Sequence, residues 1–334
     1  MIAEHEYHNA RAWFEGCRRP LLVAHRRPDG DALGALAALS IALRHLGHEP
    51  LPTLFEEFPT RYTLLRDATQ WHDWDTERAE LTQRCDAVVI LDTCARSQLE
   101  TIADWLPNAP RTLVIDHHPT RDDIGTRPGD LRLIDERAAA VCLPVAELLL
   151  AAGVPFSQPI ATALFTGLAT DSGWFQFPST DSRTLRIAAT LVDAGATPYR
   201  IYSALHERDP AARLRLIGRL LQSLELLADG RLAVLTLRQA DFAAAGADQS
   251  MTEDLVNEAK RLSGTEATVM FTEEPNGRVR VNLRSKNTLD VAALASRFGG
   301  GGHARAAGAR PDGTWDDVYR DVVAAVTEAL GPPA

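Results

Sequence analysis

Carboxylates and imidazoles stand in short groups along this sequence, most of them just after an apolar run. Oxygen and nitrogen donors of these types can bind divalent metals or transfer protons. Any one of them alone is more often a helix cap or a surface ion pair, so the functional interpretation depends on their shared placement. The set comprises His25, Asp29, Asp31, Asp92, Asp116, His117, His118 and Asp171.

The apolar runs before these groups are short and rich in β-branched residues, which is typical of buried strands. They span 20–24, 87–91 and 112–115, and longer helical patterns lie between them. Strands that alternate with helices predict a parallel sheet with helices on both faces. Ligands of such sheets bind beyond the carboxyl ends of the strands. We therefore expect acids and histidines from three strands to meet at one edge.

Several carboxylates gathered at one edge would repel one another, because like charges a few ångströms apart cannot all stay ionised. Divalent cations remove this conflict. The donor set lacks thiolates, which favours Mn²⁺ or Mg²⁺ over Zn²⁺. Six candidate ligands are more than one ion needs beside substrate and water, so we expect two metal ions that share one carboxylate.

The composition bounds the class of protein. The chain has 334 residues, 45% of them hydrophobic, which suits a globular protein of about two domains. Its net charge of −10 argues against a long duplex nucleic acid as partner. A transmembrane stretch and a secretory signal are not expected, and the four scattered cysteines fit a reducing compartment. We therefore expect a cytoplasmic protein.

Two domains of unequal size are expected from the change in pattern along the chain. We predict an α/β protein whose N-terminal domain is a doubly wound, mainly parallel sheet with helices on both faces. A linker helix and a smaller C-terminal α/β domain should follow. The expected spans are 1–195, 196–229 and 230–334.

The C-terminal half offers its own local signals. Periodic leucines predict one helix over 210–228, and a second helix is expected over 251–262. The Pro275-Asn276-Gly277 turn predicts a hairpin between the runs 267–272 and 279–284.

Taken in order, these motifs resemble the DHH phosphoesterase family over nearly the whole chain. The third motif, Asp116-His117-His118, is the triplet that names the family, and the segment from Phe298 to His303 is similar to the glycine-rich motif of its associated substrate domain. The remaining matches are His25-Arg-Arg-Pro-Asp29-Gly-Asp31, Leu91-Asp92-Thr93 and Thr170-Asp171-Ser-Gly.

The resemblance implies two Mn²⁺ ions, with Mg²⁺ or Co²⁺ as alternatives. One ion is assigned to His25 and Asp29, and Asp92 bridges. The second ion is assigned to Asp31, His117 and Asp171. The resemblance also implies that His118 lies beside the scissile phosphate and that Asp116 orients a histidine.

Substrate contacts are expected in the C-terminal half. Glycines bring backbone N–H groups close to an anion, and an arginine can hold a terminal phosphate through two hydrogen bonds. The residues assigned to this role are Arg284, Ser285, Lys286, Gly300, Gly301, Gly302 and His303.

The compact layout is most similar to family members that degrade very short RNA and dephosphorylate 3′-phosphoadenosine 5′-phosphate to AMP. Partners are therefore short RNA and small nucleotides, and a homodimer is expected from the resemblance alone. The alternatives are a phosphodiesterase of cyclic or linear dinucleotide signals and a RecJ-like exonuclease limited to short substrates. A non-enzymatic nucleotide sensor would require the loss of metal ligands, and all six positions carry competent ones.

Overall fold

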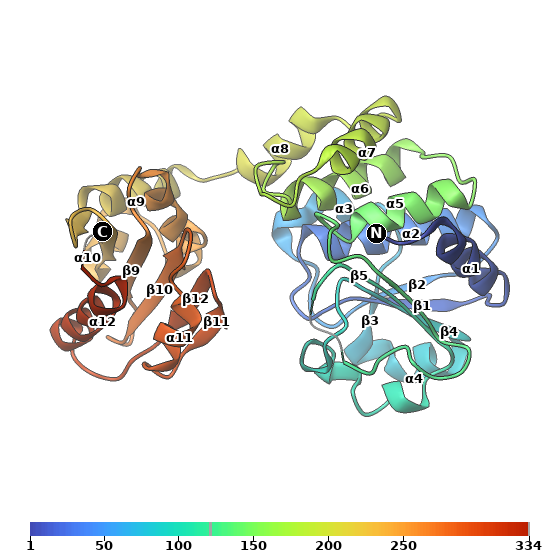
Figure 1. Cartoon of the computed structure of the whole chain (residues 1–334), viewed down its shortest axis with the longest axis horizontal. Coiled ribbons are helices and arrows are strands. Elements are labelled where there is room, and N and C mark those ends of the chain that lie inside the picture. The colour runs from blue at the N-terminus through green and yellow to red at the C-terminus, as the bar shows by residue number, and fades with distance from the viewer. Residues whose placement is uncertain (120–121, 333–334) are drawn as a thin grey trace. The chain divides into compact units, whose positions relative to one another are not determined.

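The computed structural model describes residues 1–119 and 122–332, without the side chain of His303. The chain folds into two compact units, Met1–Arg208 and Asp209–Ala334 (Figure 1). None of the described helices is long and apolar enough to cross a bilayer.

The first unit is built on a six-stranded sheet in the order β3-β2-β1-β4-β5-β6, in which every described pair is parallel. Strand order reverses between β1 and β4, and such a switch point opens a crevice beyond the carboxyl ends of the strands. The strands are β1 (Pro20–Val23), β2 (Leu51–Leu54), β3 (His72–Asp73), β4 (Ala87–Leu91), β5 (Thr112–Asp116) and β6 (Leu131–Ile134).

Helices cover both faces of this sheet, as the sequence predicts. One face carries α4 and short 3₁₀ turns, with Trp74, Leu81 and Ile102 in the core. The other carries α2, α5 and α6, together with α1, α7 and α8 around them. The α-helices are α1 (Glu4–Glu15), α2 (Gly30–His45), α3 (Thr63–Arg66), α4 (Trp74–Arg84), α5 (Cys142–Ala151), α6 (Gln158–Asp171), α7 (Ser182–Asp193) and α8 (Pro198–His206).

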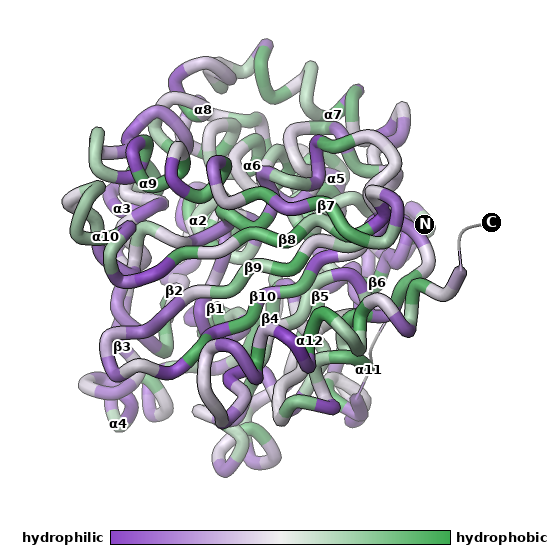
Figure 2. Tube along the Cα trace, turned by 90° about the vertical axis from the view of Figure 1, so that its left-hand side faces the viewer, coloured by the Kyte–Doolittle hydropathy of each residue, from purple (hydrophilic) through white to green (hydrophobic). Residues whose placement is uncertain are grey.

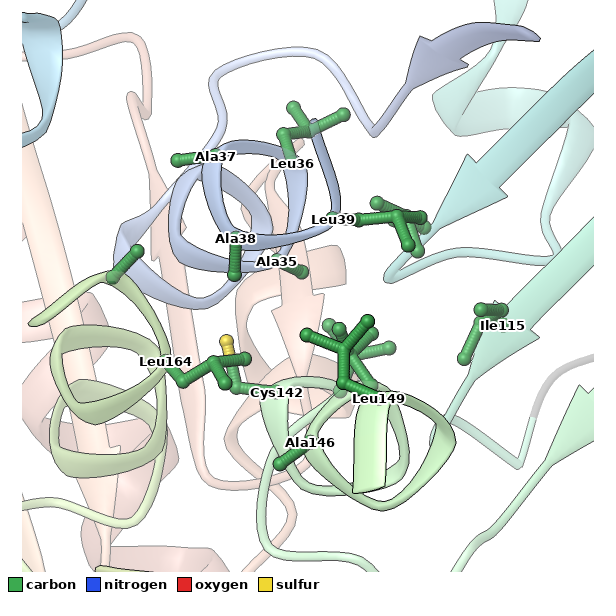
Figure 3. Close-up of a cluster of buried hydrophobic side chains, with 14 of the residues drawn as sticks. Ala35, Leu36, Ala37, Ala38, Leu39, Ile115, Cys142, Ala146, Leu149 and Leu164 are labelled. Carbon is green, nitrogen blue, oxygen red and sulfur yellow. The ribbon is translucent and has the colours of Figure 1, made fainter. Parts of the chain in front are cut away.

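Helix α2 is almost wholly apolar because it lies inside the first unit. Figure 3 shows Leu39 of α2 facing Leu149 of α5, with Ile115 of β5 beyond them. Small residues let α2 approach α6 closely: a β-carbon at Gly167 would lie 2.7 Å from Asp31 Oδ1 and 2.9 Å from Asp31 Cα. This close packing fixes the start of α2, where two of the predicted metal ligands lie.

The second unit is a mixed sheet in the order β11-β12-β10-β9-β8-β7, in which only β8 and β9 are parallel among the described pairs. Its strands are β7 (Glu225–Leu227), β8 (Leu232–Leu237), β9 (Ala267–Glu273), β10 (Val279–Ser285), β11 (Gly301–His303) and β12 (Ala306–Ala309). Figure 2 shows hydrophobic β8 in green, in agreement with its burial on both faces.

Helices also cover the second sheet. One face packs against α11 and α12, and part of the other against α9 and α10. Along β10 the residues alternate between buried and half-buried, so Arg280, Asn282 and Arg284 share one face. The helices are α9 (Ala211–Gln222), α10 (Gln239–Ala245), α11 (Val291–Ser296) and α12 (Trp315–Leu330).

Two local predictions for this unit were wrong. The helix expected over 210–228 ends at Gln222, because residues 225–227 pair with β8 as an edge strand. The helix expected over 251–262 consists of two 3₁₀ segments, Gln249–Thr252 and Leu255–Arg261. They are separated by Asp254, whose φ of 62° is incompatible with a continuous right-handed helix.

Candidate metal centre

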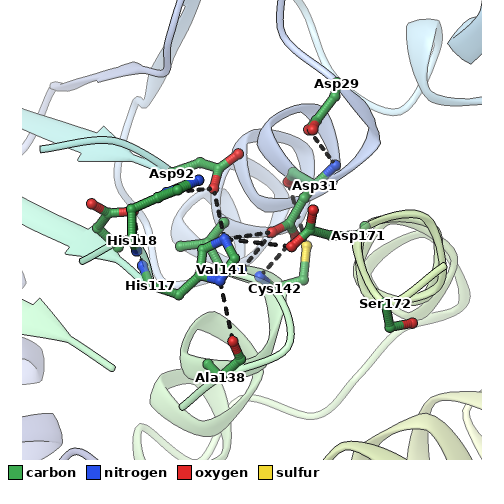
Figure 4. A network of polar contacts seen from close by, with 12 residues as sticks. Asp29, Asp31, Asp92, His117, His118, Ala138, Val141, Cys142, Asp171 and Ser172 are labelled. Carbon is green, nitrogen blue, oxygen red and sulfur yellow. Dashed lines mark hydrogen bonds and ion pairs between the residues drawn. The ribbon is translucent and has the colours of Figure 1, made fainter. Parts of the chain in front are cut away.

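All six predicted ligands lie together in the first unit. Figure 4 shows them, except for His25, which it does not label. Three elements of the sheet contribute through the residues after β1, β4 and β5, and helix ends contribute the rest. The start of α2 carries two acids, and Asp171 is the last residue of α6. The six side chains are those of His25, Asp29, Asp31, Asp92, His117 and Asp171.

Two groups of ligand atoms hold the six predicted ligands, and within each group the atoms lie no more than 4.8 Å apart; a third such group combines His118 with Asp92 and His117. Asp92 connects the groups through its two oxygens. Its Oδ2 lies 3.3 Å from His25 Nε2, and its Oδ1 lies 3.4 Å from His117 Nε2. The groups are His25, Asp29 and Asp92, and Asp31, His117 and Asp171.

Asp92 occupies a strained backbone position at the end of β4. Its φ is 63°, a conformation that costs a non-glycine residue about 1–3 kcal/mol. The Asp92 N–H donates to Ile115 O at 3.0 Å, which ties the residue to β5. The residue is 2% exposed. The strained backbone therefore places a buried carboxylate between the two groups.

The two acids of α2 are held by different helix ends. Asp29 caps α2, since its Oδ1 accepts hydrogen bonds from the N–H groups of Asp31 and Ala32. Asp31 is fully buried, and its two oxygens accept from the N–H groups of Val141 and Cys142 at the start of α5. The positive end of that helix dipole favours the carboxylate form.

Both clustered histidines present the same ring nitrogen to the carboxylates. His25 Nδ1 lies 2.7 Å from Arg26 O, and His117 Nδ1 lies 3.1 Å from Ala138 O. A carbonyl accepts only from a protonated nitrogen, so each ring carries its proton on Nδ1 when neutral. Each Nε2 is then free to act as a metal ligand, an arrangement common in metal sites.

The pKa shifts of the acids show that the cluster brings several negative charges together. Burial raises the pKa of Asp29 and of Asp31, and the charge of Asp92 adds to the rise in both. Burial also raises the pKa of Asp171 to about 6. The pKa of Asp92 is lowered despite its burial, because the neighbouring imidazoles stabilise its charge.

The pKa values of the two imidazoles are also raised, because nearby carboxylates stabilise the charged form of each ring. Burial disfavours their charged form, yet the hydrogen bond to Asp92 raises the pKa of His25 to about 9. The carboxylates of Asp92 and Asp31 raise the pKa of His117 to about 10. The cluster thus draws positive charge to itself, which divalent cations would supply.

One atom of the cluster also fits a cation directly. Asp92 Oδ1 is buried and accepts no hydrogen bond from the described residues. A buried oxygen in that state costs free energy unless a ligand or ion satisfies it. The carboxylate and imidazole donors suit a hard or borderline divalent ion. The residues present therefore fit a metal centre.

His118 lies at the more open side of the cluster, with 47% of its side chain exposed. Asp116 is fully buried, and its Oδ1 lies 2.8 Å from His118 Nδ1 and accepts the backbone N–H of His117. The hydrogen bond to Asp116 raises the pKa of His118. An oriented imidazole whose charged form is favoured by Asp116 therefore lies next to the two groups.

The predicted substrate residues lie in the second unit. Arg284 and Ser285 end β10; Arg284 Nη1 donates to Leu283 O, and Ser285 Oγ donates to Leu289 O. Lys286 Nζ donates to Leu262 O.

The glycine run forms part of a strand pair. Gly301 and Gly302 belong to β11, which pairs with β12, and Gly300 N–H donates to Ala295 O. A β-carbon at Gly302 would lie 2.5 Å from Ala306 O, so this close pairing needs glycine. The side chain of His303 lies outside the described part of the structure.

Sequence reasoning missed the groups that hold the ligands in place. The N–H groups of Val141 and Cys142 hold Asp31 across more than a hundred residues, and no local signal points to them. Gly167 leaves room for Asp31, and its only signal was a glycine inside an apolar helix. On β10, Asn282 has a buried Oδ1 without a hydrogen bond from the described residues.

Comparisons with known proteins agree with this architecture. Residues 20–168 match the DHH family, N-terminal domain, and residues 229–331 match the DHHA1 domain. A solved structure described as an exopolyphosphatase-related protein from Bacteroides fragilis has a TM-score of 0.87 at 23% identity. That likeness covers 99% of this chain and 96% of the other, and it concerns the fold.

Two relatives of similar length share the name bifunctional oligoribonuclease and PAP phosphatase NrnA. The protein from Thermus thermophilus is 31% identical over 93% of this chain and 90% of its own. The protein from Bacillus subtilis is 28% identical over 90% of this chain and 91% of its own. Because both domains match in order and the likeness spans nearly the full length, this chain belongs to the DHH family of phosphoesterases.

Proposed function

We propose that this protein hydrolyses very short RNA to mononucleotides and 3′-phosphoadenosine 5′-phosphate to AMP. The main support is the pair of ligand groups that share Asp92. The name of the relatives from Thermus thermophilus and Bacillus subtilis supports the choice of substrates.

Two Mn²⁺ ions are proposed at the centre, one at each ligand group. Asp92, which faces residues of both groups, would help to hold both ions. When bound, such ions lower the pKa of a water molecule and stabilise the charge that develops on phosphate. The protein contributes a buried, preorganised set of donors that are held by helix ends and strand ends. The ligands are His25, Asp29, Asp31, Asp92, His117 and Asp171.

His118 is proposed as the group that donates to the scissile phosphate and protonates the leaving oxygen. Its Nδ1 is engaged with Asp116, which leaves Nε2 for the substrate. The hydrogen bond to Asp116 raises the pKa of His118 and so favours the form that can give up a proton. Asp116 would act by fixing the ring in this orientation.

Arg284 and Lys286 are proposed to hold a phosphate of the substrate, together with the backbone of Gly300–Gly302 and the His303 side chain. Burial lowers the pKa of Arg284, and the charge of Asp254 opposes that fall. A half-buried guanidinium that shares a face of β10 with Arg280 suits an anionic ligand. Ser285, whose hydroxyl is engaged with Leu289 O, would contribute by fixing the turn that carries both cations.

Substrate length is proposed to be limited by charge. The chain carries a net charge of −10. Long single strands need an extended basic track, so oligonucleotides of about 2–5 residues fit better. We place the activity in the cytoplasm, since the four cysteines are buried free thiols.

The decisive experiment is product analysis on end-labelled RNA trimer and pentamer with Mn²⁺, with and without a chelator. Mononucleotides should accumulate only without the chelator, and 3′-phosphoadenosine 5′-phosphate should yield AMP. Cyclic di-AMP serves as the competing substrate. Hydrolysis of cyclic di-AMP in preference to both RNAs would reject the proposed substrate class.

A further inference from the structure

An exposed aromatic surface begins next to Asp171. On α8, Tyr199, Tyr202 and His206 lie at spacings of three and four residues and therefore share one helix face. Tyr199 is 71% exposed and Tyr202 is 42% exposed, whereas Ile201 and Leu205 on the other face are buried in the core. This face is aromatic along its length, and neither the metal centre nor the core uses it.

Trp174, which is half-buried and packs partly against the core, joins this surface from the turn after α6. Its ring centroid lies 4.8 Å from that of Tyr202 and 5.5 Å from that of His206. Its Nε1–H donates to His206 Nε2 at 2.7 Å. The hydrogen bond fixes the orientation of the indole, so Trp174, Tyr202 and His206 form one ordered group, here named the aromatic platform.

The turn that carries Trp174 is organised around Ser172, which is fully buried. Ser172 Oγ donates to Leu168 O and accepts from Phe175 N–H at 3.0 Å. Gly173, Trp174 and Phe175 have φ values of 59°, 57° and 64°. Two consecutive non-glycine residues in this region cost about 1–3 kcal/mol each, and such strain concentrates at functional sites.

The same turn fixes the distance between platform and metal centre. Trp174 follows Asp171 by three residues, so their Cα atoms lie no more than about 11 Å apart. Asp171 is one of the six clustered ligands, and the turn held by Ser172 fixes the position of Trp174 relative to Asp171. A nucleotide whose phosphate lies at the centre could therefore extend its base to this surface.

Aromatic rings, rather than aliphatic side chains, favour one kind of occupant. Nucleobases stack on tryptophan and tyrosine, and this contact tolerates any base sequence because every base has a π-face. Stacking also needs no positive charge, which suits a chain with a net charge of −10. We propose that Trp174 and Tyr202 hold a base of the nucleotide bound at the metal centre, one ring stacked on the face of the base and the other, at 75° to it, against the edge of the base, with His206 as the positioning residue; this inference rests on the proposed function.

The test compares ligands with and without a base. Binding of AMP and of ribose 5-phosphate is measured by calorimetry in Mn²⁺ for the wild type, Trp174→Ala, Trp174→Phe and Tyr202→Ala. The two alanine variants should raise the Kd for AMP about tenfold and leave that for ribose 5-phosphate within about twofold. Trp174→Phe, which keeps an aromatic ring, should retain most of the wild-type affinity for AMP. Leu185→Ala removes a side chain that is 52% exposed on α7 and serves as the matched control.

The results distinguish this inference from the proposed function. Equal weakening of both ligands would indicate a disturbed turn and overturn the platform, and unchanged AMP binding in both alanine variants would do the same. A change in sedimentation for Tyr202→Ala with normal AMP affinity would assign the surface to a second copy of the chain. If AMP binding depends on Trp174 but no short RNA is hydrolysed, the platform stands and the proposed function fails.

Discussion

The two units present polar side chains of opposite character. In the first unit, carboxylates and imidazoles face one another, and buried Asp92 Oδ1 has no hydrogen bond from the described residues. In the second, Arg280, Asn282 and Arg284 share a face of β10, where the buried Asn282 Oδ1 is likewise unpartnered among the described residues. The first unit is thus suited to cations, whereas the two arginines of β10 would suit the second unit to an anion.

The contrast also shows that residue type alone does not identify a ligand site. Ser285 and Lys286 use their polar atoms on Leu289 O and Leu262 O, and Gly302 is required by strand pairing. Each has a structural role that exists without substrate. In the first unit, by contrast, the buried Asp92 Oδ1 accepts no hydrogen bond from the described residues, so its placement specifies a ligand more sharply.

The largest effect should come from Asp92, which connects the two ligand groups. Asp92→Asn keeps the shape and tolerates the left-handed backbone, but it removes the shared charge. We expect turnover of the adenosine dinucleotide pApA to fall about a thousandfold or more, with loss of Mn²⁺ binding in calorimetry. Asp104→Asn, at an exposed acid, is the control. Two tightly bound Mn²⁺ ions in folded Asp92→Asn would contradict the shared-ligand arrangement.

A variant of His118 tests whether metal binding and catalysis can be separated within the first unit. His118→Ala should lower turnover about a hundredfold, because it removes a general acid, while Mn²⁺ content stays unchanged. Metal analysis and kinetics on pApA in the same preparation measure both. Loss of metal together with activity would assign His118 to the ligand set.

An added methyl group in a helix should lower the free energy of unfolding of the first unit and raise that of the second. Gly167→Ala places a β-carbon against Asp31, and we expect it to lower the free energy of unfolding by about 1–3 kcal/mol and to impair activity. Gly218 lies inside exposed α9 with no atom near its added β-carbon. Gly218→Ala should therefore stabilise the second unit by about 0.5–1 kcal/mol. Denaturant titration measures both, and equal stability of Gly167→Ala and wild type would refute the packing argument.

Arg284 tests the anionic side of the comparison. Arg284→Ala should raise the KM for pApA about tenfold with little change in kcat, because a charge-assisted hydrogen bond to a phosphate is lost. Arg278→Ala, at the start of the same hairpin strand and paired with Asp312, should leave KM unchanged. An unchanged KM for Arg284→Ala would move the phosphate contact elsewhere.

The smallest effect concerns a buried ion pair away from the metal centre. Arg183 lies 2.6 Å from Asp135 and, although burial opposes ionisation, lowers the pKa of Asp135 below its usual 3.8. A lowered folded-state pKa stabilises the protein above the unfolded value and loses this contribution as pH falls through the folded value. Urea titrations from neutral to acidic pH should show a shallower acid decline in Arg183→Met than in wild type. Parallel declines would remove this ion pair from the acid response.

Much of the first unit could be predicted because its signals are local. Runs of β-branched residues identify β1, β4 and β5, and the polar residues that follow them necessarily lie at the carboxyl edge of a parallel sheet. The prediction that residues 251–262 form an α-helix failed because backbone conformation at Asp254 depends on its surroundings. Edge strand β7 escaped prediction for a similar reason, since its leucines also fit a helix.

The sequence by itself determined which side chains can bind a metal and on which strand ends they stand. Tertiary structure alone decided that Asp31 meets the N–H groups of Val141 and Cys142, that Gly167 admits this contact, and that Trp174 meets His206. The physical reason is distance along the chain. Periodicity and turn chemistry act over a few residues, whereas these contacts form only when helices far apart in sequence pack at close range.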